Sequence, residues 1–197
     1  MQAQPLPKRL FTVAEWEKLP DQPRYELFDG DIVMQARPSA IHQETNVELT
    51  TQLRTYLRGK KYHIFSELAV RFEYNDTVLV PDIIVVCDPS KIHKNYCVGA
   101  PDLIIEILSP STGGIDKVLK LDRYQSEGVR EYWIVDSTHR VVDVYQWDNG
   151  LCPPHPYTAA DKIKVGVLED CEIDLSLVFP AIEEDETPDG YLSDDEV

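Results

Sequence analysis

Apolar residues recur at close to the helical period in two long stretches of the chain. The first runs from Ile41 to Arg58 and lies between Ser39, a residue type that caps helix N-termini, and Gly59, which favours a helix end. The second runs from Ile115 to Glu127 and is followed by Gly128. We expect one helix in each stretch.

The segment before the first long helix predicts a short helix and a hairpin. In LFTVAEWEKLP, Thr12 lies three residues before Glu15, which is the spacing of a capping box at a helix start. RYELFDGDIVMQ then has the pattern of two short strands around Asp29-Gly30, a strong hairpin signal. We therefore expect an N-terminal β-hairpin.

Three longer strands are predicted between the two long helices. They are YHIFSELAVRFEY, TVLVPDIIVVC and PDLIIEILS. The last two are almost entirely apolar, as in strands that are covered on both faces. After the second long helix, VREYWIVD and RVVDVYQW predict two more strands, and VGVLEDCEIDL predicts a further one.

This order of elements predicts an α/β fold with a central mixed sheet flanked by helices. The chain of 197 residues is long enough to bury a core as a single domain, which we place at residues 1–182. Residues 183–197 contain eight acids and no bases, so we expect an acidic, disordered tail there.

The net charge of −16 limits the possible partners. Half of it remains when the eight acids of the tail are set aside, so the body of the chain is acidic too. This argues against tight nonspecific binding to nucleic acid, which Lys and Arg drive by releasing counterions from phosphates. No stretch approaches the ~20 apolar residues of a membrane helix, and the start lacks the apolar core of a signal peptide. We expect a cytoplasmic protein with no membrane partner.

Two acids lie in or beside strands that the pattern predicts to be buried. Because side chains alternate between the faces of a strand, Glu106 shares a face with Ile104, and Asp82 shares a face with Ile84 in the preceding strand. If these strands are adjacent, the two carboxylates come together, and burying both without a partner is costly. A divalent cation would remove this cost. Two carboxylates, with water and a substrate phosphate, suit Mg²⁺ or Mn²⁺.

Purely structural roles stay open for the same residues. Glu106 could pair with an Arg inside the sheet. Asp82 and Asp102, each preceded by Pro, could mark the starts of strands. Lys120, in the following helix, could supply positive charge near a reacting phosphate, or it could pair with Asp116 four residues earlier on the helix surface.

Six motifs, in order along the chain, resemble one protein family. They are YELFDG (25–30), PSAIHQ (38–43), VPDIIVV (80–86), APDLIIEILSPST (100–112), DKVLKLDRY (116–124) and GVREYWIVD (128–136). Together they are similar to the Uma family of proposed endonucleases, which is assigned to the PD-(D/E)xK, restriction-endonuclease-like superfamily. The resemblance implies a restriction-endonuclease-like fold with the order helix, three strands, helix and strand.

The resemblance also implies a metal site. Asp82 would be the acid of the first motif and Glu106 the acid of the second, with the backbone carbonyl of Ile107 as a further ligand of Mg²⁺ or Mn²⁺. The chain departs from the superfamily pattern two residues after Glu106, where Leu108 replaces the usual lysine. This departure leaves the source of the catalytic lysine open.

The next helix could supply that lysine. Lys120 holds the position that resembles the family's, and Lys117 is a second candidate. Glu26 resembles the family's additional acid, which would complete the metal site or orient the lysine. His42, in the first turn of the first long helix, could contact a phosphate or the attacking water, or it could only cap or pack that turn.

These roles predict metal-dependent hydrolysis of phosphodiester bonds in DNA. The bases that could line a local groove are few: Lys60-Lys61, Lys91, Lys94 and Lys8-Arg9. We therefore expect weak DNA affinity in the isolated chain, or a homodimer that assembles the groove and cuts both strands. Two alternatives stay open. One is a non-catalytic binding or regulatory module that engages a basic protein partner, and the other is a metal-dependent enzyme acting on a smaller phosphate substrate.

Overall fold

The computed structural model of the chain describes residues 10–20, 24–72, 76–108, 115–147 and 153–179, without the side chains of residues 115–118. Its helices are α1 (Val13–Trp16), α2 (Ala40–Leu57) and α3 (Ile115–Ser126), with a 3₁₀ turn at Pro89–Lys91. Its strands are β1 (Tyr25–Phe28), β2 (Asp31–Met34), β3 (His63–Ser66), β4 (Ala69–Arg71), β5 (Val78–Leu79), β6 (Ile83–Val86), β7 (Tyr96–Val98), β8 (Leu103–Ile107), β9 (Glu131–Asp136), β10 (Val141–Gln146), β11 (His155–Thr158), β12 (Lys162–Lys164) and β13 (Glu172–Asp174). The two long helices and the β1–β2 hairpin are confirmed.

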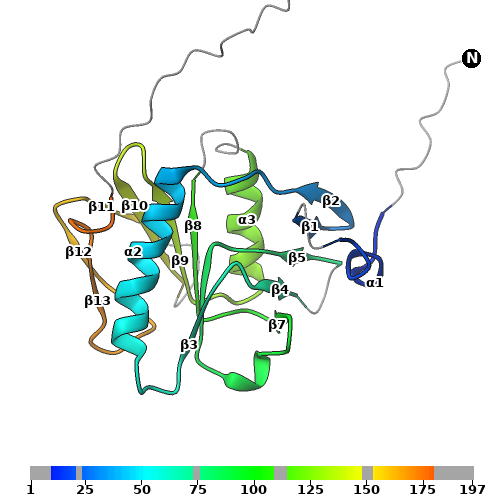
Figure 1. Ribbon diagram of the computed structural model, residues 1–197, viewed down its shortest axis with the longest axis horizontal. Helices are drawn as coiled ribbons and strands as arrows, with labels where there is room; N and C mark the ends of the chain where they lie inside the picture. Colours follow the sequence, from blue (N-terminus) through cyan, green and yellow to red (C-terminus); the bar gives the residue numbers. More distant parts are fainter. Residues whose placement is uncertain (1–9, 21–23, 73–75, 109–114, 148–152, 180–197) are drawn as a thin grey trace, which may run out of the picture.

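Two mixed sheets form the centre of the described part of the chain (Figure 1). The larger has six strands in the order β11-β10-β9-β8-β6-β3, in which β8 and β9 are parallel. The smaller has five strands in the order β2-β1-β5-β4-β7, in which β4 and β7 are parallel. β12 and β13 pair separately. The α/β class is confirmed, but the strands predicted to form one central sheet belong to two sheets.

The six-stranded sheet is covered on both faces, as its apolar strands predict. One face packs against buried leucines of α2 and against the β12–β13 hairpin. The opposite face packs against Tyr124 of α3 and against the five-stranded sheet, through residues such as Val70 and Leu79. α2 and α3 therefore lie on opposite sides of β6 and β8, the two strands that carry the predicted acids.

Two of the predicted strands are each divided between the two sheets, which corrects the prediction. The first divides into β3 and β4 at Glu67, whose φ of 55° lies in the left-handed region that extended strands do not use. The second divides into β5 and β6 around Pro81, which has no N–H for a ladder. The N–H of Val80 bonds to the carboxylate of Glu26 instead. The chain therefore changes sheets beside the predicted site.

Short strands account for the remaining differences. β7 lies where the sequence predicts a loop, and β11 and β12 lie where the pattern predicts no strand. Each has only three or four residues, too few for a clear alternation of apolar and polar positions.

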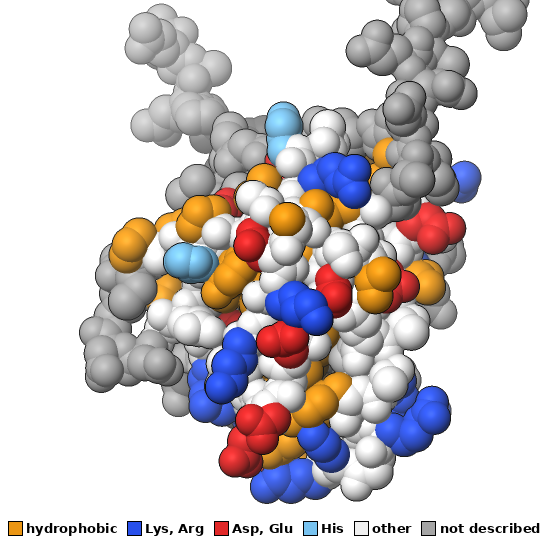
Figure 2. Space-filling view, turned by 90° about the vertical axis from the view of Figure 1, so that its left-hand side faces the viewer, with side chains coloured by type: hydrophobic (Ala, Val, Ile, Leu, Met, Phe, Trp, Pro, Cys, Tyr) orange, Lys and Arg blue, Asp and Glu red, His pale blue; other side chains and the backbone are white. Residues whose placement is uncertain are grey.

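Side chains of both charges cover the face shown in Figure 2, with Lys and Arg gathered towards its lower end. No helix in the described part of the chain is long and apolar enough to cross a membrane. The predicted boundary at residue 182 and the acidic tail, residues 183–197, lie outside the described residues.

Candidate active site

Asp82 and Glu106 lie together at one end of the six-stranded sheet. β6 and β8 are antiparallel neighbours in which Ile83 pairs with Ile105, and the same register places Asp82 opposite Glu106. The Oδ2 atom of Asp82 accepts a hydrogen bond from the backbone N–H of Ile107 at 2.7 Å. The structure thus brings together the two acids and the residue predicted to contribute a carbonyl ligand.

Lys120 joins this pair from α3. Its Nζ atom lies 3.2 Å from Oε1 of Glu106 and 3.0 Å from Oε1 of Glu26, and the side chain is buried. Tyr124, one turn further along the helix, donates its hydroxyl to Oε1 of Glu106 at 2.7 Å. Lys120 is therefore a buried neighbour of the acids rather than a surface lysine.

Glu26 is fixed more firmly than an acid in a hairpin arm usually is. It is only 4% exposed. Besides Lys120, its Oε1 atom accepts the N–H of Val80 at 2.8 Å and the side-chain amide of Gln35 at 3.2 Å. Glu26 is therefore placed to hold Lys120 in position.

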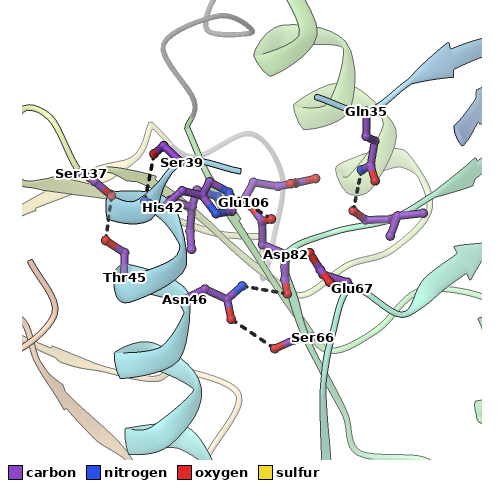
Figure 3. A network of polar contacts seen from close by, with 12 residues as sticks. Gln35, Ser39, His42, Thr45, Asn46, Ser66, Glu67, Asp82, Glu106 and Ser137 are labelled. Atoms are coloured by element: carbon purple, nitrogen blue, oxygen red, sulfur yellow. Dashed lines mark hydrogen bonds and ion pairs between the residues drawn. The ribbon is translucent and has the colours of Figure 1, made fainter. Parts of the chain in front are cut away.

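His42 faces Asp82 from the first turn of α2. Its Nε2 atom lies 3.2 Å from Oδ1 of Asp82, and Figure 3 shows the ring between α2 and the strand that carries Glu106. Burial alone would lower the pKa of His42, but the hydrogen bond and the charge of Asp82 outweigh it and raise the pKa. Among the described residues, its buried Nδ1 atom has no hydrogen-bond partner.

Burial dominates the ionisation of Glu106. Burial, together with the carboxylates of Asp82 and Glu26, raises the pKa of Glu106 to about 7 against the opposing charge of Lys120. Burial and the neighbouring Glu106 also raise the pKa of Tyr124 well above its usual value, so the hydroxyl stays protonated and donates. A cation bound here would therefore compete with a proton on Glu106 near neutral pH.

The donor set fits a Mg²⁺ or Mn²⁺ ion better than a metal held wholly by side chains. Within the described residues, no cluster of three or more His, Cys, Asp or Glu side chains is placed to hold a metal ion. What the sheet end offers is the carboxylates of Asp82 and Glu106, with the N–H of Ile107 bonded to Asp82. Mg²⁺ commonly binds through one or two carboxylates and keeps several water ligands. The two carboxylates meet that requirement.

The other predicted positions have different outcomes. Asp102 accepts the N–H of Cys87 at 2.7 Å and lies 3.2 Å from Arg130, so its structural role at a strand start is confirmed. Leu108 packs against the apolar core. The side chain of Lys117 lies outside the described residues, so its role as the second candidate for the catalytic lysine stays a prediction.

Two contacts of the site are not predicted from the sequence. Tyr124 lies four residues after Lys120 and so on the same face of α3, and this spacing could have indicated that its hydroxyl reaches Glu106. Gln35 gives no such signal, because its amide bonds to Glu26 and to the carbonyl of Val80 depend on how the hairpin folds against β5.

Comparison with known families matches residues 13–176 to the Uma2 family, whose description is “putative restriction endonuclease”. The chain belongs to the Uma2 family. The family resemblance drawn from the six sequence motifs is thereby confirmed.

Two relatives from Synechocystis sp., both described as uncharacterized proteins, also match this Uma2 chain. One is 29% identical over 154 residues, which is 77% of this chain and 80% of the relative. The other is 28% identical over 144 residues, 70% of this chain and 81% of the relative.

A solved structure supports the fold of this Uma2 protein. The crystal structure of a “putative nuclease belonging to DUF820” from Anabaena variabilis superposes with a TM-score of 0.73 at 22% identity, and covers 86% of this chain and 97% of that one. The likeness shows that the fold is shared, and the fold is restriction-endonuclease-like. The family and the fold together support a nuclease-like protein.

Proposed function

We propose that this Uma2 protein is a metal-dependent endonuclease that hydrolyses phosphodiester bonds in DNA. Asp82, Glu106 and the carbonyl of Ile107 would hold Mg²⁺ or Mn²⁺, and Glu26 and Lys120 would complete the catalytic set. One observation carries the proposal: the carboxylate of Asp82 bonds to the N–H of Ile107, directly beside Glu106, while Lys120 contacts Glu106 from α3. The acids and a lysine thus lie together at one end of the sheet, although Leu108 stands where the superfamily pattern has its lysine.

Each side chain would have a distinct task. A bound Mg²⁺ would polarise the phosphoryl oxygen and lower the pKa of a water molecule. The ammonium of Lys120 would stabilise the negative charge that develops on the phosphate, or, in its neutral amine form, Lys120 would help to deprotonate the water. Glu26 would orient Lys120, since it accepts a hydrogen bond from its ammonium at 3.0 Å. The hydroxyl of Tyr124 would fix the orientation of Glu106.

The test is calorimetric titration of Mn²⁺ into wild type and Glu106→Ala, followed by nicking of supercoiled plasmid with the same samples. We expect both metal binding and nicking to fall by more than about 100-fold in the variant, because loss of even an outer partner of a metal ligand costs about 10- to 100-fold. Asp102→Asn is a matched control: it changes an acid at the other end of β8 and should leave both readouts near wild type.

Other outcomes would change the assignment. Full metal-dependent nicking by Glu106→Ala would remove Glu106 from the metal site. If wild type bound no Mn²⁺ and cut nothing, a non-catalytic module would become the better proposal. A panel of duplex DNA, single-stranded DNA, RNA and small phosphodiesters identifies the substrate class. Sedimentation of the full chain tests the predicted homodimer.

A further inference from the structure

Two side chains of helix α2 contact Asp82, one at its carboxylate and one at its backbone carbonyl. The Nε2 atom of His42 lies 3.2 Å from Oδ1 of the carboxylate, and the side-chain amide of Asn46 donates to the backbone carbonyl of the same residue at 3.3 Å. His42 and Asn46 are four residues apart and so lie on one face of the helix. Figure 3 shows both side chains directed from α2 towards Asp82.

The opposite side of Asp82 is held by main-chain groups. Oδ2 of its carboxylate accepts the N–H of Ile107, and its carbonyl accepts the N–H of Glu67 at 3.1 Å. Asp82 therefore has two contacts at its carboxylate and two at its carbonyl. In each pair, one partner is a side chain of α2 and the other belongs to the sheet region. Both the backbone and the side-chain direction of this acid are thereby fixed.

Packing of the helix alone does not explain why residue 42 is a histidine. It is buried, yet its Nδ1 atom has no hydrogen-bond partner among the described residues. An unpaired polar atom that is out of water destabilises a fold, and an apolar side chain of similar size would avoid that cost. The contact that distinguishes His42 from such a side chain is the one from Nε2 to Asp82.

We infer that His42 and Asn46 are positioning residues that hold Asp82 in the orientation needed to bind the metal ion. The inference rests on the proposed metal site and adds to it two residues outside the predicted ligand set. Groups that hydrogen-bond a metal-ligating carboxylate restrict its orientation, and their loss weakens metal binding although they never touch the ion.

The test compares Mn²⁺ affinity with the thermal stability of the metal-free chain in wild type, His42→Leu and His42→Gln. We expect His42→Leu to bind Mn²⁺ about 10- to 100-fold more weakly while it keeps a cooperative unfolding transition close to that of wild type. His42→Gln places an amide donor near the position of Nε2 and should recover most of the affinity. Thr45→Val is the matched control, because Thr45 is buried on the same helix but bonds to Ser137 rather than to Asp82.

The possible results separate the inference from the proposed function. If wild type binds no Mn²⁺, both are overturned. If wild type binds Mn²⁺ and His42→Leu binds it equally well, only the inference is overturned. If His42→Leu does not fold, Asn46→Ala carries the test, since it removes the amide contact to the carbonyl of Asp82 from a half-buried position. Wild-type affinity in Asn46→Ala would then overturn the inference.

Discussion

Glu106 links the charge of the site to the stability of the fold. Its carboxyl lies in the sheet, close to Asp82 and Glu26, and burial raises its pKa from 4.5 to about 7. A carboxyl with a raised pKa holds its proton in the folded chain at a pH where the unfolded chain has already released it. Between these two pKa values the folded state therefore binds more protons than the unfolded state.

We expect the metal-free chain to lose stability as the pH rises from 4.5 to about 7 through this residue. Above that window the whole cost of the buried charge is present, on the order of 3 kcal/mol. Glu106→Gln has no proton to release, so its free energy of unfolding should fall less over the same window. Urea unfolding of both proteins in a chelator, at several pH values, measures the difference. Parallel pH profiles would show that Glu106 does not carry this cost.

The sequence predicts the acids of the site better than their surroundings. Strand alternation places Asp82 and Glu106 on sheet faces, and the family resemblance adds Glu26 and Lys120, all of which the structure brings together. The contacts of Gln35 and His42 could not be predicted in the same way. Their partners come from distant segments, and a side-chain hydrogen bond depends on tertiary packing that local periodicity does not encode.

At the scale of elements, helix ends follow from local chemistry and strand ends do not. Ser39 caps α2 by accepting the N–H of His42 at 3.2 Å, as its residue type predicts. The division of strands at Glu67 is different, because a non-glycine residue with positive φ has no reliable sequence signal. The N–H of Glu67 bonds to the carbonyl of Asp82, and the N–H of Val80 bonds to Glu26; both N–H groups lie where the chain changes sheets. Part of the backbone that builds the site therefore lies where the sequence does not predict the ends of strands.

The cap of α2 gives a prediction at this scale. Ser39→Ala removes the acceptor for the N–H of His42 and should lower the free energy of unfolding by about 1 kcal/mol. Because the first turn of α2 carries His42, fraying of that turn should also weaken Mn²⁺ binding. Ser39→Asp keeps a capping oxygen and serves as the control. Chemical unfolding and calorimetry measure the two effects, and unchanged values in Ser39→Ala would show that the cap does not support the site.

At the scale of the whole molecule, the distribution of charge decides how an acidic chain could approach a nucleic acid. The net charge is −16, yet four exposed bases follow one another at the C-terminal end of α2: Arg54, Arg58, Lys60 and Lys61. Among the described residues none of the four forms an ion pair with an acid, whereas Lys162 lies 3.3 Å from Asp174. His42 lies at the other end of the helix, about 25 Å away at 1.5 Å per residue. A duplex bound at the site could reach this cluster, because 25 Å is only about seven base pairs of DNA.

We expect this basic cluster to contribute to DNA affinity through phosphate contacts. Lys60→Gln and Lys61→Gln should each weaken binding to all sequences alike and reduce the slope of log affinity against log salt by about 1, because each removes one phosphate contact and its counterion release. Lys162→Gln is the matched control, since its acidic neighbours already neutralise that charge locally. Fluorescence anisotropy of labelled duplex in metal-free buffer over a range of salt concentrations measures the slopes. Equal slopes in all three variants and wild type would place the DNA elsewhere on the surface.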